Sequence, residues 1–217
     1  RDRTLDRRVA VKRLRPELSG SPAELEKLVA QARQMAGLKH PGIVQVHSVE
    51  RDGGDAFLVL ELAEGRTLAK LLAEEGPQPW EDARRVVRAV AEALDYAHVR
   101  GVLHSDLKPS NVMVAPSGSV KVMDFALAYA AKATVSRLTR SDAFGGLPYM
   151  SPEQELGDPS PAADAFALAA CFYEALTGKR PFPGPDRQWV VSTQGGRQPR
   201  WNGNGKELFY RDGNKMM

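Results

Sequence analysis

Polar and apolar side chains alternate along residues 7–13, close to the start of the chain. This alternation includes two β-branched valines and predicts a β-strand that has Val9 and Val11 on one face. Ala10 and Lys12 then share the other face. Lysine is almost never fully buried unless it is paired, so Lys12 is noteworthy if that face points inward.

A helix and a hairpin follow this strand in the pattern. Ser21 is a typical N-cap residue, because a proline follows it and a glutamate stands three positions further on. Apolar residues then recur at helical spacing, and we expect the helix to end near Gly37. The apolar runs 43–50 and 56–62 are separated by the turn-forming residues 51–54, which predicts a β-hairpin.

The remaining pattern is mainly helical up to about residue 180. Residues 67–75 and 80–100 have helical periodicity, and residues 161–178 form an apolar helix of the kind that lies in the middle of a core. Short apolar runs broken by proline and glycine predict small strands and an ordered loop over residues 102–122. Residues 126–150 have no clean period, which is typical of a long functional segment.

The last part of the chain changes character. From residue 188 to residue 217, β-rich runs alternate with Gly-Gly, Asn-Gly and Asp-Gly pairs. This pattern is typical of β-hairpins, because these pairs adopt the backbone conformations that tight hairpin turns require. We therefore expect a separate β segment here.

Composition narrows the class of protein. The chain has 217 residues, of which 42% are hydrophobic and 26% charged, and this excludes disorder along the whole chain. The formal net charge of +3 is too small to predict nucleic-acid binding. Cys171 is the single cysteine, so no internal disulfide can form, and its apolar neighbours place it in the core. No apolar run has the length of a spanning helix and no secretion signal opens the chain, so we expect a cytoplasmic protein.

The candidate chemistry lies in one stretch. Asp106, Lys108 and Asn111 fall within six residues, and Asp124 follows Asn111 by thirteen. Carboxylate and amide oxygens are ligands for Mg²⁺, and a lysine ammonium binds phosphate. An ordinary polar loop explains any two of these residues, whereas the complete set favours a site for a divalent cation and a polyanion.

These residues belong to a series of motifs that resembles the eukaryotic-type protein kinases, specifically the serine/threonine kinases of bacteria. The resemblance covers roughly residues 1–186, with the motifs in the family's order. They are VAVK at 9–12, HPGIV at 40–44, HSDLKPSN at 104–111, DFA at 124–126, GGLPYMSPE at 145–153 and LTGKRPF at 176–182. The resemblance implies an α+β, two-lobed fold, with a small β-rich lobe that contains one helix and a larger helical lobe.

The resemblance also implies a role for each polar residue. Lys12 would hold the α and β phosphates of ATP, and Asp106 would accept or orient the proton of the substrate hydroxyl. Lys108 would neutralise the transferred phosphoryl group. Asn111 and Asp124 would ligate Mg²⁺, which makes ATP and Mg²⁺ the expected cofactors and a protein hydroxyl the expected substrate.

Further residues are assigned to nucleotide binding and to the core by the same resemblance. Leu60 would be the gatekeeper, and the backbone of Glu61 and Ala63 would face adenine. Ala10 and Met113 would also line the nucleotide site. A stack that links the two lobes would consist of Met35, Val46, Phe125 and His104, tied to Asp164; without the resemblance, each of these is a plain core residue.

Four positions depart from the family's pattern. Gln31 stands where a glutamate usually pairs with the lysine, so Lys12 would gain at most a neutral hydrogen bond there. Ser105 replaces the arginine that clamps a phosphorylated activation loop. Ala126 replaces a glycine, and Leu147 replaces a threonine that usually bonds to the catalytic aspartate and lysine.

The resemblance also indicates how the chain is divided. The family's glycine-rich loop is absent from the chain, as are the closing helices expected beyond Pro183, so apolar surface would be exposed. Residues 195–210 resemble one blade of a TolB-type propeller, and one blade cannot close a propeller. We expect a partial small lobe at 1–60, a hinge at 61–65, a partial large lobe at 66–186 and a propeller-like β segment at 187–217.

Three hypotheses for the function remain at this stage. The first is an ATP-dependent protein serine/threonine kinase, favoured by the joint presence of the five polar residues described above. The second is a pseudokinase, a nucleotide-binding or scaffolding module with little or no transfer, favoured by the four departures and the missing loop. The third is a truncated kinase fragment without function.

Overall fold

The computed structural model describes residues 2, 6–13, 22–52, 55–125, 147–155 and 157–181, together with the backbone of 197–201, 208–212 and 215–216. The chain divides into two compact units, Arg1–Pro183 and Gly184–Met217. The predicted boundary at residues 186 and 187 lies outside the described residues, as do residues 126–146 of the predicted irregular segment.

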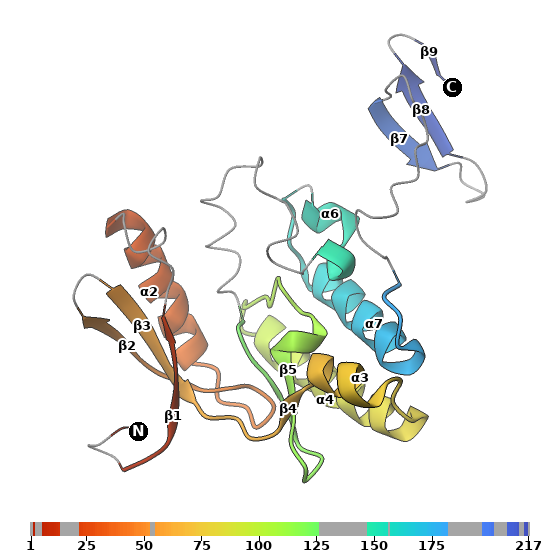
Figure 1. Ribbon diagram of the computed structural model, residues 1–217. Coiled ribbons are helices and arrows are strands. Elements are labelled where there is room, and N and C mark those ends of the chain that lie inside the picture. Colours follow the sequence, from red (N-terminus) through yellow and green to blue (C-terminus); the bar gives the residue numbers. More distant parts are fainter. Residues whose placement is uncertain are drawn as a thin grey trace. The chain divides into compact units, whose positions relative to one another are not determined.

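A three-stranded antiparallel sheet begins the first unit (Figure 1). Its strands are β1 (Val9–Arg13), β2 (Val46–Asp52) and β3 (Asp55–Glu61), in the order β1-β3-β2. Buried and half-buried residues alternate along the whole of β3, which is the pattern of a strand with one face in the core. The predicted strand and the predicted hairpin are both confirmed.

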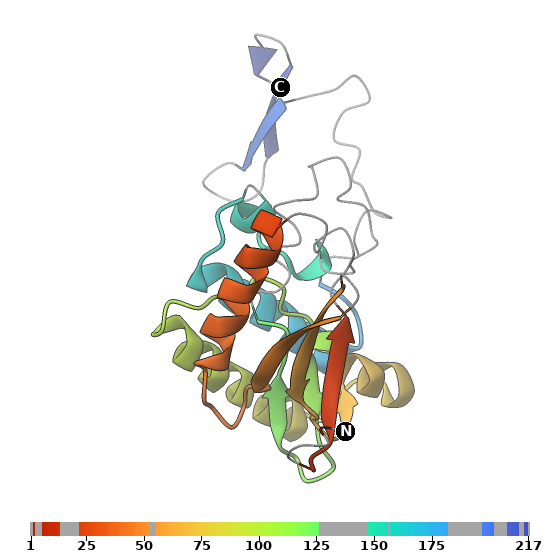
Figure 2. The same ribbon diagram turned by 90° about the vertical axis from the view of Figure 1, so that its left-hand side faces the viewer.

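Helix α2 (Pro22–Ala36) lies beside this sheet and contacts β2 (Figure 2). It ends where Gly37 follows, as the sequence predicted. Ala32 and Met35 on its last turns are buried, so this end of the helix is fastened to the core. The small β-rich part of the fold therefore contains one helix, as expected.

The second part of the unit is built on helices α3 (Leu68–Glu75), α4 (Trp80–His98), α6 (Pro152–Glu155) and α7 (Pro161–Thr177). The hydroxyl of Thr67 accepts a hydrogen bond from the backbone of Lys70 at 3.1 Å and caps α3. Ser160 caps α7 in the same way, and Gly178 ends α7 in the left-handed conformation. Cys171 on α7 is buried, which confirms its place in the core.

A second small sheet accompanies these helices. It consists of β4 (Arg66–Thr67), β5 (Val112–Val114) and β6 (Val120–Val122), paired antiparallel in that order. One 3₁₀ turn, Pro109–Asn111, leads into β5, and another spans Leu147–Tyr149. The small strands and ordered loop that were predicted between residues 102 and 122 are thus present.

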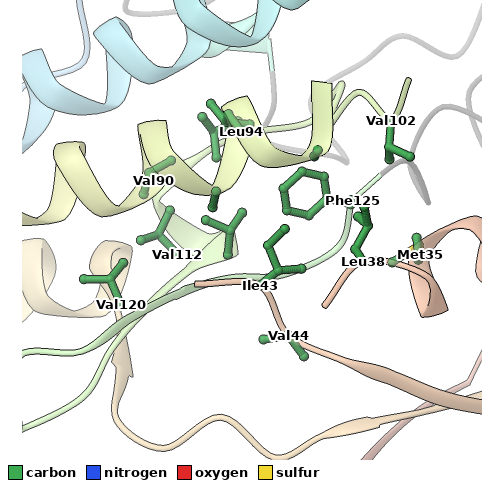
Figure 3. Close-up of a cluster of buried hydrophobic side chains, with 14 of the residues drawn as sticks. Met35, Leu38, Ile43, Val44, Val90, Leu94, Val102, Val112, Val120 and Phe125 are labelled. Carbon is green, nitrogen blue, oxygen red and sulfur yellow. The ribbon is translucent and has the colours of Figure 1, made fainter. Parts of the chain in front are cut away.

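The two parts of the unit share one core. Figure 3 shows Phe125 close to Leu38 and to Leu94 of α4, with Ile43 between this group and Val112. The contact continues in the backbone, because Val44 N–H donates to Val122 O at 2.9 Å and Val122 N–H donates to Gly42 O at 2.8 Å. The segment before β2 is therefore bonded to β6, which immediately precedes the candidate site.

Some large apolar side chains remain at the surface of this unit. Trp80 at the start of α4 is 55% exposed, and Tyr173 near the end of α7 is 47% exposed. The Trp80 ring contacts Phe172, with centroids 5.7 Å apart. These two side chains thus leave apolar surface exposed on the helices of this unit.

The second unit contains the strands β7 (Arg197–Trp201), β8 (Leu208–Asp212) and β9 (Lys215–Met216), which form an antiparallel sheet of their own. This confirms the hairpin pattern predicted for the tail. In the parts of the chain that the structure describes, no helix is both long and apolar enough to cross a membrane.

Candidate active site

Asp164 organises the loop that carries the candidate catalytic residues. This carboxylate lies on α7 and is only 2% exposed. Its Oδ2 accepts the backbone N–H of His104 at 2.8 Å, and its Oδ1 accepts that of Ser105 at 2.8 Å. His98 Nε2, from the end of α4, lies 2.8 Å from Oδ2. A buried carboxylate that is satisfied in this way fixes the loop relative to two helices.

His104 links the loop to the segment that carries Asp124. Its Nε2 donates to the carbonyl of Met123 at 3.0 Å, and its Nδ1 accepts the N–H of Asp106 at 3.3 Å. Burial lowers the pKa of His104 from 6.5, which agrees with a neutral ring that donates at one nitrogen and accepts at the other. The ring also packs on Phe125, with centroids 4.7 Å apart.

The structure brings Asp106, Lys108 and Asn111 together. Lys108 Nζ lies 2.8 Å from Asp106 Oδ2, and Asn111 Nδ2 donates to Asp106 O at 2.8 Å. Lys108 precedes the 3₁₀ turn Pro109–Asn111 and Asn111 ends it, so the side chains at the two ends of this turn both reach Asp106. The ammonium group of Lys108 and the amide group of Asn111 therefore both lie against Asp106.

Lys12 and Asp124 meet although they come from different parts of the unit. Lys12 Nζ on β1 lies 2.7 Å from Asp124 Oδ2, which follows β6. Asp124 has a positive φ of 66°, and Met123 just before it donates its N–H to Asn111 O at 3.0 Å. Met123 is thus hydrogen-bonded to both Asn111 and His104. These two bonds hold the next residue, Asp124, beside the group formed by Asp106, Lys108 and Asn111.

The other residues predicted to bind the nucleotide lie on β1, β3 and β5 and in the segment that follows β3. Leu60 is 9% exposed and pairs with Ala10 across β1 and β3. Glu61 ends β3, and Ala63 packs against the core cluster two residues later. Met113 lies on β5, opposite Lys121. The structure therefore places these residues on the two small sheets and the connection between them.

Lys121 is a charged residue of this region that the sequence analysis did not single out. Its Nζ lies 2.7 Å from Glu61 Oε1, and Glu61 Oε2 accepts the N–H of Gln45 at 3.2 Å. Burial alone would raise the pKa of Glu61, but the bonds from Lys121 and Gln45 outweigh it, so the pKa lies below 4.5. A lysine between Val120 and Val122 is a charged residue within a short β-branched run, and this was a usable signal.

The residues of the predicted inter-lobe stack are all buried. Met35, Val46 and Phe125 are each at most 5% exposed and belong to one core cluster, and His104 is fully buried against Phe125. The tie to Asp164, through the backbone of His104, is also present.

Two of the four departures from the family's pattern, Gln31 and Ser105, have side chains in the described part of the structure. Gln31 Oε1 is buried and has no hydrogen-bond partner among the described residues, while Lys12 is paired with Asp124. Ser105 is buried with a positive φ of 60°. Ala126 and the side chain of Leu147 lie outside the described part of the structure.

Comparisons with known proteins agree with this geometry. The sequence profile of the protein kinase domain matches residues 1–200. Serine/threonine-protein kinase PknA of Mycobacterium tuberculosis strain H37Rv is 41% identical over 189 residues, which is 84% of this chain and 44% of PknA. Serine/threonine-protein kinase PknB of Mycobacterium leprae is 37% identical over 189 residues, which is 85% of this chain and 30% of PknB.

A third relative is the probable serine/threonine-protein kinase PknB of Corynebacterium glutamicum, with 38% identity over 84% of this chain and 29% of that protein. The chain thus spans less than half the length of each of these three relatives. The profile match and the ordered site residues lead to the same assignment, and the chain belongs to the protein kinase domain family.

Proposed function

We propose that this protein is a serine/threonine kinase that transfers the γ-phosphoryl group of Mg-ATP to a protein hydroxyl. The observation that supports this most strongly is the meeting of Lys12 with Asp124, beside the group formed by Asp106, Lys108 and Asn111. Phosphoryl transfer needs positioned charge more than covalent chemistry, and these five side chains supply both signs of charge in one place.

Each of these side chains has a distinct task in the proposed reaction. Asp106 orients the acceptor hydroxyl and takes its proton as the new phosphate ester forms. Lys108, already paired with Asp106, neutralises the negative charge of the phosphoryl group in transit. Lys12 binds the phosphates that do not move, and holds the nucleotide in register with Asp106.

The donor atoms fit a magnesium ion. Asn111 directs its amide nitrogen to Asp106 O, which leaves its amide oxygen as the atom suited to a cation. Asp124 adds a carboxylate, and hard oxygen donors of this kind are those that Mg²⁺ prefers. When bound, the ion would neutralise phosphate charge. Among the described residues no three His, Cys, Asp or Glu side chains form a metal cluster.

We further propose that adenine lies against the two small sheets. Ala10 and Leu60 offer apolar surface from the first sheet, and Met113 offers it from the second. Glu61 and Ala63 supply backbone hydrogen-bonding groups in the connection between the two parts. An ATP-consuming enzyme of this kind would act in the cytoplasm, on a protein that carries a serine or threonine.

A pseudokinase is the second candidate, and one observation favours it. Gln31, at the position of the usual glutamate, leaves its buried amide oxygen without a partner among the described residues. Such a site would bind a nucleotide without holding the geometry needed for transfer. For the second unit, we propose a TolB-type repeat, supported by its three antiparallel strands.

The test is phosphoryl transfer from γ-labelled ATP to a basic protein acceptor, measured beside Asp106→Asn and the exposed control Asp95→Asn. Loss of a general base lowers the rate by about 10²–10⁴-fold, so transfer by Asp106→Asn should fall by that factor. Asp95→Asn should match the wild type. A nucleotide-dependent rise in melting temperature without transfer would favour the pseudokinase, and neither signal would indicate a fragment without function.

A further inference from the structure

The peptide bond before Asp106 is held from both sides. Ser105, which precedes Asp106, has a φ of 60°, a conformation that serine rarely adopts. Ser105 is buried, with 7% of its surface exposed. Such a conformation persists only where the surrounding structure enforces it. Ser105 N–H donates a hydrogen bond to Asp164 Oδ1 at 2.8 Å. The peptide unit before this one is therefore also fixed.

Gln154 supplies the second contact. Its Nε2 on α6 donates to Ser105 O at 2.6 Å. The backbone N–H of Gln154 is itself 3.3 Å from Ser151 Oγ, and Ser151 is fully buried. The hydrogen bond to Ser151 therefore holds the backbone of Gln154, which carries the donating side chain, in place in α6. The sequence analysis assigned no role to Gln154.

Ser105 O and Asp106 N–H belong to the same rigid peptide plane. Gln154 holds the carbonyl of this plane, and His104 Nδ1 accepts its N–H at 3.3 Å. A plane held at both ends cannot rotate, and its rotation is what would turn the Cα–Cβ bond of Asp106 away from the substrate. We propose that Gln154 is a positioning residue that fixes the orientation of Asp106. This inference rests on the proposed kinase function.

Two variants separate positioning from simple packing. Gln154→Glu keeps the shape of the side chain but replaces the donating amide by a carboxylate, which repels the carbonyl of Ser105. Its protonated form donates again, and the pKa of a carboxyl that faces a carbonyl in a half-buried place is raised. Gln154→Met removes the donor at every pH. Gln34→Glu is the matched control, because Gln34 is exposed on α2.

The wild type and all variants share the other ionisable groups around this peptide. These are Asp164 on α7 and His104, Asp106 and Lys108 in the loop. Each variant is therefore compared with the wild type at the same pH. A change of kcat or amide protection with pH that Gln154→Glu shows and Gln154→Met lacks is then caused by protonation of the introduced carboxyl.

The experiment measures kcat, KM for ATP, and hydrogen exchange of the Ser105 and Asp106 amides in the full chain. For Gln154→Glu at about pH 8, we expect kcat to fall about tenfold with KM unchanged, and amide protection to fall by a similar factor. As the pH is lowered and the introduced carboxyl becomes protonated, both should move back towards the wild-type values. Gln154→Met should stay low throughout, and Gln34→Glu should match the wild type.

Wild-type protection of both amides in Gln154→Met, or wild-type kcat and amide protection in Gln154→Glu at about pH 8, would overturn the inference. The exchange measurement does not depend on turnover. If the wild type transfers no phosphate, the proposed function fails, while the amide protection of the variants still decides whether Gln154 holds this peptide.

Discussion

Lys12 has a different partner from the one that the family's pattern provides. The residue at the position of the usual glutamate is Gln31, and a neutral amide competes poorly with a carboxylate for an ammonium group. In the structure Lys12 lies 2.7 Å from Asp124. The same carboxylate is proposed to bind Mg²⁺, so the lysine and the cation compete for it when nucleotide enters. A second carboxylate near Lys12 would relieve this competition.

Gln31→Glu is therefore expected to increase activity. The new carboxylate would attract Lys12, leave Asp124 to the cation, and raise kcat/KM for ATP by about five- to tenfold, which is the effect of one charge-assisted contact. Steady-state kinetics at several Mg²⁺ concentrations measure this change. Gln34→Glu, the same substitution at an exposed position of α2, should have no effect. An unchanged or lower kcat/KM in Gln31→Glu would show that the pairing of Lys12 with Asp124 does not limit the activity.

At the scale of elements, the connection between β3 and β4 depends on a glycine. Gly65 has a φ of 110° and is the last residue of the hinge expected at 61–65. A Cβ atom at this position would lie 2.1 Å from Val114 O on β5, a distance that no real Cβ tolerates. The close pairing of β4 with β5 thus requires the absence of a side chain.

Gly65→Ala should destabilise the first unit strongly. We expect a loss of at least about 3 kcal/mol, because the clash involves backbone and not a flexible side chain. Gly101→Ala is the control, since Gly101 also has a positive φ, of 71°, but nothing within 4 Å of its added Cβ. It should lose about 1 kcal/mol, the ordinary penalty of that backbone conformation. Denaturant unfolding measures both, and equal losses would contradict the proposed steric cause.

The ion pair between Glu61 and Lys121 joins β3 to β6 across the two parts of the unit. Because the pKa of Glu61 is lowered below 4.5 in the folded state, the pair stabilises the fold above that pH. The stabilisation is lost as the pH falls through the lowered pKa. Both side chains are partly exposed, so the contribution is at most about 1 kcal/mol.

Glu61→Gln should therefore be less stable than the wild type near neutral pH. The difference in the free energy of unfolding should shrink below pH 4.5, where the wild-type carboxylate becomes protonated. Lys121→Met should behave in the same way, because it removes the same pair. Unfolding curves recorded across this pH range measure the difference, and a gap that persists in acid would contradict the role of the ion pair.

Across the whole molecule, periodicity was enough to predict most elements, including β1, α2, the hairpin of β2 and β3, and α7. The strand alternation drew attention to Lys12, and residue type and spacing grouped Asp106, Lys108, Asn111 and Asp124 as a candidate site. The role of each residue followed only from the family resemblance. The contact of Gln154 with Ser105 was not predictable from either source. It depends on how α6 is placed against the loop, which is a tertiary feature with no local pattern.

Nucleotide binding should stabilise the entire first unit, because the proposed site draws residues from both of its parts. A ligand at one hundred times its Kd adds about 2.7 kcal/mol, which corresponds to a rise of about 5–10 °C in Tm. Mg-ATP should produce this shift in the wild type and in Lys39→Met, whose side chain is exposed. Lys12→Met and Asp124→Asn should lose it. Equal shifts in all four proteins would place the nucleotide elsewhere.

The most direct test of the shared site is the rate of γ-phosphoryl transfer in Lys12→Met, Asp106→Asn and the double variant. Residues that act as one unit are strongly non-additive, so each single variant should lose about 10³-fold and the double variant little more. Losses that multiply in the double variant, or a wild-type rate in either single variant, would contradict the claim that these side chains serve one nucleotide.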